Sequence, residues 1–81
     1  MAIYRLDVEK KYGQLQFRLY PQGDAAGAFG APAPDIKALI AALDAALEPL
    51  DTKNKVDSVI FRNIEYGSKR DLRETVRFSK F

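Results

Sequence analysis

The chain has 81 residues, of which 47% are hydrophobic and 30% are charged, and its formal net charge at pH 7 is +2. This size and composition predict one folded domain over residues 1–81 and exclude a disordered or collagen-like chain. Because the sequence contains no histidine and no cysteine, it excludes disulfides, the ordinary zinc sites, and the catalytic triads and pairs that need these residues.

The sequence also lacks the usual signals for a membrane or for secretion. Its first residues carry neither a basic start nor a long apolar run, and no stretch approaches the ~18 consecutive apolar residues of a membrane span. We therefore expect a cytoplasmic protein that does not contact a membrane.

Residues 2–20 are predicted to form a β-hairpin. Apolar residues alternate with polar ones over residues 4–9 and again over residues 14–20, which is the pattern of strands with one buried face. Between them, residues 10–13 have the length and the glycine of a tight turn.

Residues 21–34 are predicted to form a loop, because they contain three glycines, three prolines and a single charged residue. A loop longer than about twelve residues is uncommon in a small domain unless it is functional or disordered. Phe29 is its one large apolar side chain, so we expect Phe29 either to fill the core or to be displayed to a partner.

Residues 35–49 are predicted to form an amphipathic helix. Apolar residues recur at spacings of three and four from Ile36 to Leu50, and Asp35 is placed to cap the first turn. Pro49 and the polar residues 51–54 are expected to end this helix.

Residues 55–80 are predicted to form a second β-hairpin, which turns around residues 67–71. Leu72, Val76 and Phe78 alternate with polar residues, as in a strand. The alternative is a C-terminal helix that Ser68 caps and in which Leu72 and Val76 lie on one side. The segment around Ile60 is apolar on both faces, which predicts either an inner strand of the sheet or a strand whose outer face a second copy covers.

Together these elements predict a two-layer α+β fold of order ββαββ, in which one amphipathic helix packs on one face of a four-stranded antiparallel sheet. In size, in its lack of catalytic residues and in this order, the chain is similar to small inhibitor proteins of phages and other mobile elements. The similarity rests on architecture alone and points to no family.

No group of residues indicates an enzyme, a cofactor or a metal. The glycines at 23, 27 and 30 match neither the dinucleotide-binding nor the Walker spacing. Asp44 and Glu48 share a helix face, but this face lies opposite the apolar stripe, where water solvates both carboxylates.

The sequence supports two functional hypotheses. The first is a non-enzymatic protein-binding module, an inhibitor or adaptor that covers a partner's surface, with self-association to a homodimer as one form of it. Its candidate contact residues are Phe29, Ile60, Arg62, Ile64 and Tyr66.

The second hypothesis is nucleic-acid binding, because residues 53–81 hold eight basic and four acidic residues. Its candidate contacts are Arg18, Tyr20, Arg62, Lys69, Arg70, Arg73, Arg77 and Lys80. We expect Arg5, Gln14, Gln16, Arg18 and Tyr20 of the first hairpin to share the uncovered sheet face with Arg73, Thr75 and Arg77 of the last strand. Acidic residues are interspersed in the same region, as on an ordinary solvated surface.

Overall fold

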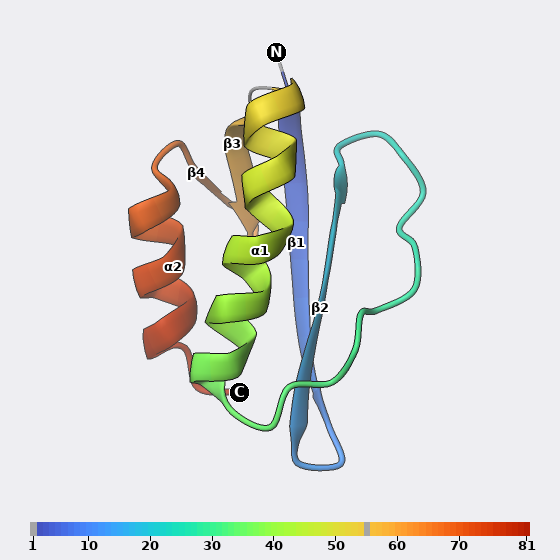
Figure 1. The fold of residues 1–81 in the computed structure, drawn as a ribbon, viewed down its shortest axis with the longest axis vertical. Helices are drawn as coiled ribbons and strands as arrows, with labels where there is room; N and C mark the ends of the chain where they lie inside the picture. Colours follow the sequence, from blue (N-terminus) through green and yellow to red (C-terminus); the bar gives the residue numbers. More distant parts are fainter. Residues whose placement is uncertain (1, 55) are drawn as a thin grey trace.

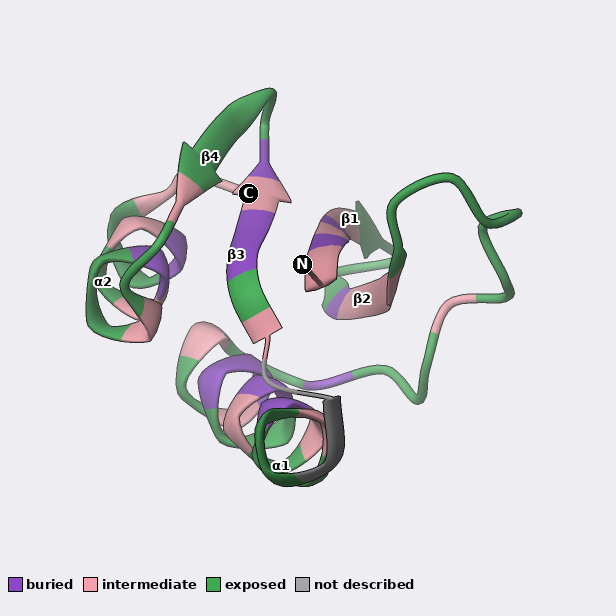
Figure 2. Ribbon diagram, turned by 90° about the horizontal axis from the view of Figure 1, so that it is seen from above, coloured by how far each residue is buried: buried purple, intermediate pink, exposed green. Residues whose placement is uncertain are grey.

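Four strands and two helices make up the structure, a computed structural model that describes residues 2–54 and 56–81 (Figure 1). In chain order they are β1 (Ala2–Lys11), β2 (Gln14–Pro21), α1 (Ile36–Asn54), β3 (Val56–Phe61), β4 (Ile64–Tyr66) and α2 (Lys69–Phe78). Both helices pack on the same face of the sheet (Figure 2). The α+β class is confirmed, whereas the predicted ββαββ order with one helix is wrong. The predicted start of the second hairpin, residue 55, lies outside the described residues.

The first hairpin is confirmed, with β1 and β2 antiparallel and Leu6 opposite Leu19. Tyr12 and Gly13 form its turn, and both have positive φ values, 54° and 77°. Two such residues are characteristic of the type I′ turn, whose twist matches that of the flanking strands.

The sheet is mixed rather than antiparallel. Its strand order is β2-β1-β3-β4, and β1 runs antiparallel to β2 but parallel to β3. After β2, the loop leads the chain back to the opposite end of the sheet, and α1 then returns it, so that β3 starts at the same end as β1 (Figure 1). The prediction that the strand around Ile60 is an inner strand is confirmed, because β3 lies between β1 and β4.

Helix α1 begins where the sequence predicts, since the backbone N–H of Ala38 donates to the Asp35 carboxylate at 2.8 Å. Its predicted end at residue 49 is wrong, because the helix continues through Pro49 to Asn54. Proline removes the hydrogen bond to the carbonyl of Ala45, but Ala45 is exposed and water can solvate that carbonyl. Leu47 is buried before the proline, and Leu50 after it is half-buried against the core, so packing continues past it.

Helix α2 replaces the predicted last strand. The side chain of Ser68 caps it by accepting a 3.5 Å hydrogen bond from the N–H of Asp71, as the alternative interpretation expects. Leu72 and Val76, one helical turn apart, are fully buried, whereas Phe78 is 79% exposed. A strand would place all three side chains on one face, so the exposure of Phe78 agrees with the helix.

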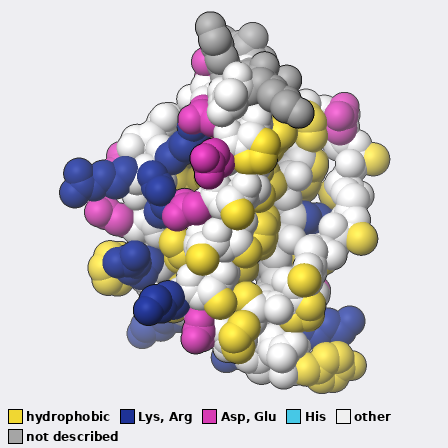
Figure 3. Space-filling model, viewed as in Figure 1, with side chains coloured by type: hydrophobic (Ala, Val, Ile, Leu, Met, Phe, Trp, Pro, Cys, Tyr) yellow, Lys and Arg dark blue, Asp and Glu magenta, His cyan; other side chains and the backbone are white. Residues whose placement is uncertain are grey.

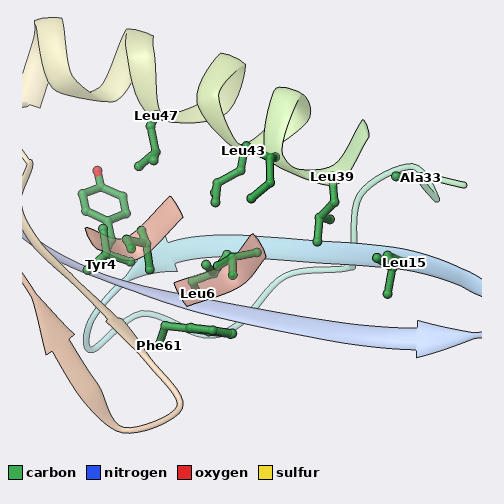
Figure 4. Packing of buried hydrophobic residues seen from close by; sticks show 12 residues of the cluster. Tyr4, Leu6, Leu15, Ala33, Leu39, Leu43, Leu47 and Phe61 are labelled. Atoms are coloured by element: carbon green, nitrogen blue, oxygen red, sulfur yellow. The ribbon is translucent and has the colours of Figure 1, made fainter. Parts of the chain in front are cut away.

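The core lies between the two helices and one face of the sheet. Leu39, Leu43 and Leu47 point from α1 toward the strands (Figure 4). The other buried apolar residues include Tyr4, Leu6, Leu15, Val59 and Phe61 from the strands and Leu72 and Val76 from α2. Neither of the two described helices packs on the second face of the sheet, which we call the open face.

Candidate protein-binding surface

The turn between β3 and β4 decides where the predicted contact residues point. Arg62 and Asn63 both have positive φ values, 54° and 64°, and form a two-residue turn. Phe61 pairs with Ile64 across it, so Ile64 lies on the sheet face that the helices cover. Tyr66 lies on the same face, since it pairs with the buried Val59.

The predicted surface of Ile60, Arg62, Ile64 and Tyr66 is therefore divided. Ile60 pairs with Arg5 and Glu65 and lies on the open face, where it is half-buried. Arg62 lies in the turn, and its guanidinium stacks on the rings of Phe61 and Phe81, 5.3 and 4.9 Å from the ring centroids. The prediction treats residues 60–66 as one strand, whereas the chain reverses at residues 62–63.

An open groove lies between β4 and α2. The residues that line it are Arg62, Tyr66, Asp71, Glu74, Thr75, Phe78, Ser79 and Lys80. We call this the β4–α2 groove. Only Arg62 and Tyr66 belong to the predicted protein contacts, and Arg62 and Lys80 to the predicted nucleic-acid contacts.

Apolar side chains are exposed along the β4–α2 groove. Phe78 is 79% exposed in its wall, and Ile64, two residues before Tyr66 on β4, is 56% exposed. A single exposed apolar residue is normal, but large apolar residues exposed on both elements that form a groove are typical of an interaction surface.

The groove has an acidic end and a basic end. Asp71 lies in the first turn of α2, close in the chain to Tyr66. At the opposite end, Lys80 follows α2, and Arg62 stacks on Phe81. Glu74 lies one turn beyond Asp71 and is paired with Arg70 at 3.5 Å. A bound molecule therefore meets opposite charges at the two ends.

The two edges of the sheet differ. At the β2 edge, the loop returns and Leu15 exchanges two hydrogen bonds with Ala33, at 2.8 and 2.6 Å, while Gly30 N–H donates to the Phe17 carbonyl. At the β4 edge, no strand or loop pairs within residues 2–54 and 56–81. β4 and β2 lie at opposite ends of the sheet (Figure 2).

Phe29 is neither buried in the core nor fully exposed. It is half-buried, and the guanidinium of Arg18 lies 4.5 Å from the centroid of its ring. Arg18 also pairs with Asp7 at 2.8 Å, and the Tyr20 hydroxyl donates to the same carboxylate at 3.0 Å. On the open face these side chains bind one another. Arg18 and Tyr20 are therefore less available to contact a nucleic acid.

The predicted basic surface also differs from expectation. Arg5, Gln14, Gln16, Arg18 and Tyr20 lie on the open face as predicted, because their partners in the register lie opposite the core positions. Arg73, Thr75 and Arg77 do not, since they belong to α2 on the covered face.

Several of the basic residues on α2 are engaged in ion pairs. Arg73 bridges to Asp44 of α1 at 3.0 Å, and Lys69 bridges to Asp51. Asp44 is therefore held by an arginine rather than by water alone. Figure 3 shows Lys and Arg side chains gathered over α2 with acidic side chains among them. This mixture gives a weaker attraction for phosphates than a continuous basic surface.

The described part of the chain holds neither a cluster of metal-ligating residues nor a membrane-spanning helix. Over the residues searched, no three His, Cys, Asp or Glu side chains gather into a metal site. None of the described helices has the length and apolarity needed to cross a membrane. Comparison with protein-family models, with curated proteins and with solved structures finds no match to this chain.

Sequence reasoning missed the α2 side of the groove. Phe78 does not share the four-residue spacing of Leu72 and Val76, and this was the available signal that it points away from the core. The similarity to phage inhibitor proteins rested on the ββαββ order, which the structure lacks, and it carries no further weight.

Proposed function

We propose that the protein is a non-enzymatic, cytoplasmic protein-binding module that acts as an inhibitor or adaptor by covering a surface of its partner. The observation that carries this proposal is the exposure of Ile64 and Phe78 beside the β4–α2 groove. Their burial would contribute to binding, because the hydrophobic effect stabilises a complex by about 25 cal/mol for each Å² of apolar surface removed from water.

Two further features support protein as the partner. Tyr66 and Arg62 in the groove are residue types that are enriched at the centres of protein interfaces. The free edge of β4 lies next to these side chains, and sheet edges are common sites of protein association.

Nucleic-acid binding receives less support. Of its candidate contacts, Arg18, Lys69, Arg70 and Arg73 are in ion pairs with carboxylates. A phosphate would therefore compete with these carboxylates for the same cations.

The test is a comparison of variants in affinity capture. The protein is immobilised and exposed to a lysate of the organism that makes it, alongside the double variant Ile64→Thr/Phe78→Ser. A matched control is Tyr12→Asn, which removes an aromatic residue that is 94% exposed at the β1–β2 turn. Asparagine tolerates the positive φ at this position. We expect a protein that the parent and the control retain and that the double variant loses.

Two results would contradict the proposal. One is that no retained protein depends on Ile64 and Phe78. The other is oligonucleotide binding in fluorescence polarisation that decreases linearly with salt on a log-log plot, which would favour the nucleic-acid hypothesis.

A further inference from the structure

The backbone at the free edge of β4 offers one complete pairing site. Phe61 and Ile64 flank the two-residue turn and form its hydrogen-bonded pair, so the next pair, Ile60 and Glu65, is not hydrogen-bonded. The N–H and C=O of Glu65 therefore point away from β3. These are the groups that an added strand uses.

The side chain of Glu65 sets the charge of a matching strand. Glu65 lies on the open face and is exposed. A residue directly opposite it on an added strand would have its Cβ about 4.5–5.5 Å away, where opposite charges attract and like charges repel. A lysine or arginine is complementary at that position.

The neighbours of this basic residue face the β4–α2 groove. Because side chains alternate along a strand, the residues before and after it lie on the same side as Ile64 and Tyr66. There they would cover the exposed surfaces of Ile64 and Phe78. Large apolar side chains fit these two positions.

A second copy of this chain is a poorer match for the same edge. Symmetric antiparallel pairing of two β4 strands about Glu65 sets the two Glu65 carboxylates directly opposite each other, which is destabilising. The charge at the edge therefore opposes self-association and favours a partner with a basic residue.

Resting on the proposed function, we infer that the partner contributes an extended segment of the pattern apolar–basic–apolar, which adds to β4 as a fifth strand. Its basic residue pairs with Glu65 on the open face. Its apolar residues cover Ile64, Tyr66 and Phe78. Two features define this segment: main-chain hydrogen bonds to Glu65, and side chains that alternate between apolar and basic.

A phage-displayed library of random 12-residue peptides tests the inference. It is selected on the parent protein and depleted on Glu65→Pro, which removes the outward N–H of Glu65. Proline is tolerated at such an edge position, because this N–H takes no part in the pairing with β3. We expect enriched peptides with a lysine or arginine between two apolar residues.

A charge exchange supplies the second measurement and keeps the test valid if Glu65→Pro fails to fold. The enriched peptide and its Lys/Arg→Glu form are titrated against the parent and against Glu65→Lys by fluorescence polarisation. We expect Glu65→Lys to bind the enriched peptide about tenfold more weakly than the parent does, a change of ~1.4 kcal/mol in the free energy of binding. We expect the same variant to bind the Lys/Arg→Glu peptide more tightly than the parent does.

Peptides without the pattern, binding that is unchanged in Glu65→Pro or Glu65→Lys, or an absence of enriched peptides would each overturn strand addition. Dimerisation of the parent that Glu65→Pro abolishes would overturn it in favour of a second copy. If Ile64→Thr/Phe78→Ser still loses a captured protein while Glu65→Pro retains it, the proposed function stands and strand addition alone is wrong.

Discussion

Truncation to alanine should lower the free energy of unfolding far more at Leu72 than at Phe78, although both residues lie in α2. Leu72 is fully buried, and Leu72→Ala removes three carbon groups, which corresponds to ~2.4 kcal/mol of transfer free energy at ~0.8 kcal/mol for each group. The cavity that remains adds to this, so we expect a loss of about 3 kcal/mol in the free energy of unfolding. Phe78 is 79% exposed, and alanine has the higher helix propensity, so Phe78→Ala should change stability by less than about 0.5 kcal/mol.

The assay is urea unfolding followed by circular dichroism. With an m-value of about 1 kcal/mol per molar urea, Leu72→Ala should lower the midpoint by about 3 M, and Phe78→Ala should leave it within about 0.5 M. A chain of this size has a stability of roughly 4–12 kcal/mol, so over most of this range Leu72→Ala still folds. A loss above about 2 kcal/mol for Phe78→Ala would refute the assignment, because only a strand places Phe78 on the buried side with Leu72.

Three further changes test the supporting contacts by urea unfolding. Asp35→Ala should cost about 1 kcal/mol because Ala38 N–H loses its cap, while Asp35→Asn should cost little, and equal losses would contradict the cap. A double-mutant cycle of Arg73→Ala and Asp44→Ala should give a coupling of at most about 1 kcal/mol that salt weakens, since both side chains are 42% exposed; a larger, salt-independent value would contradict this. Ser58→Ala should be neutral or stabilising by about 1 kcal/mol, because the buried Ser58 hydroxyl has no hydrogen-bond partner among the described residues, and a clear loss would indicate one.

Local patterns in the sequence were sufficient for the elements whose signals lie close together in the chain. The first hairpin, the loop and the start of α1 follow from alternation, from glycine and proline content, and from the cap at Asp35. The inner position of β3 agrees with its apolar residues on both faces, because side chains of the strands on either side shield part of Ile60 on the open face.

The remaining features depend on packing between distant segments. Leu72 and Val76 are four residues apart, a spacing that fits one face of a strand and one face of a helix equally. The cap at Ser68 was visible, but only burial against the core distinguishes the helix. The parallel pairing of β1 with β3 has no local signal, because each strand alone is compatible with either direction.

The candidate site, too, depends on contacts between segments that are distant in the sequence, which is why it could be predicted only in part. Ile64 and Tyr66 could be named as candidate contact residues, but the groove that Tyr66 shares with Phe78 requires both the turn at Arg62 and the helix that follows. The basic residues of α2 were counted as free cations because their acidic partners on α1 lie far away in the sequence.

The loop that pairs with the first half of β2 also bears on how strands could add to the sheet. A sheet with two free edges can accept a strand at each end, and repeated addition then extends into a fibre. Here Ala33 and Gly30 already occupy hydrogen-bonding groups of Leu15 and Phe17. The loop therefore opposes strand addition along the first half of β2, whereas at β4 no described segment competes with an added strand.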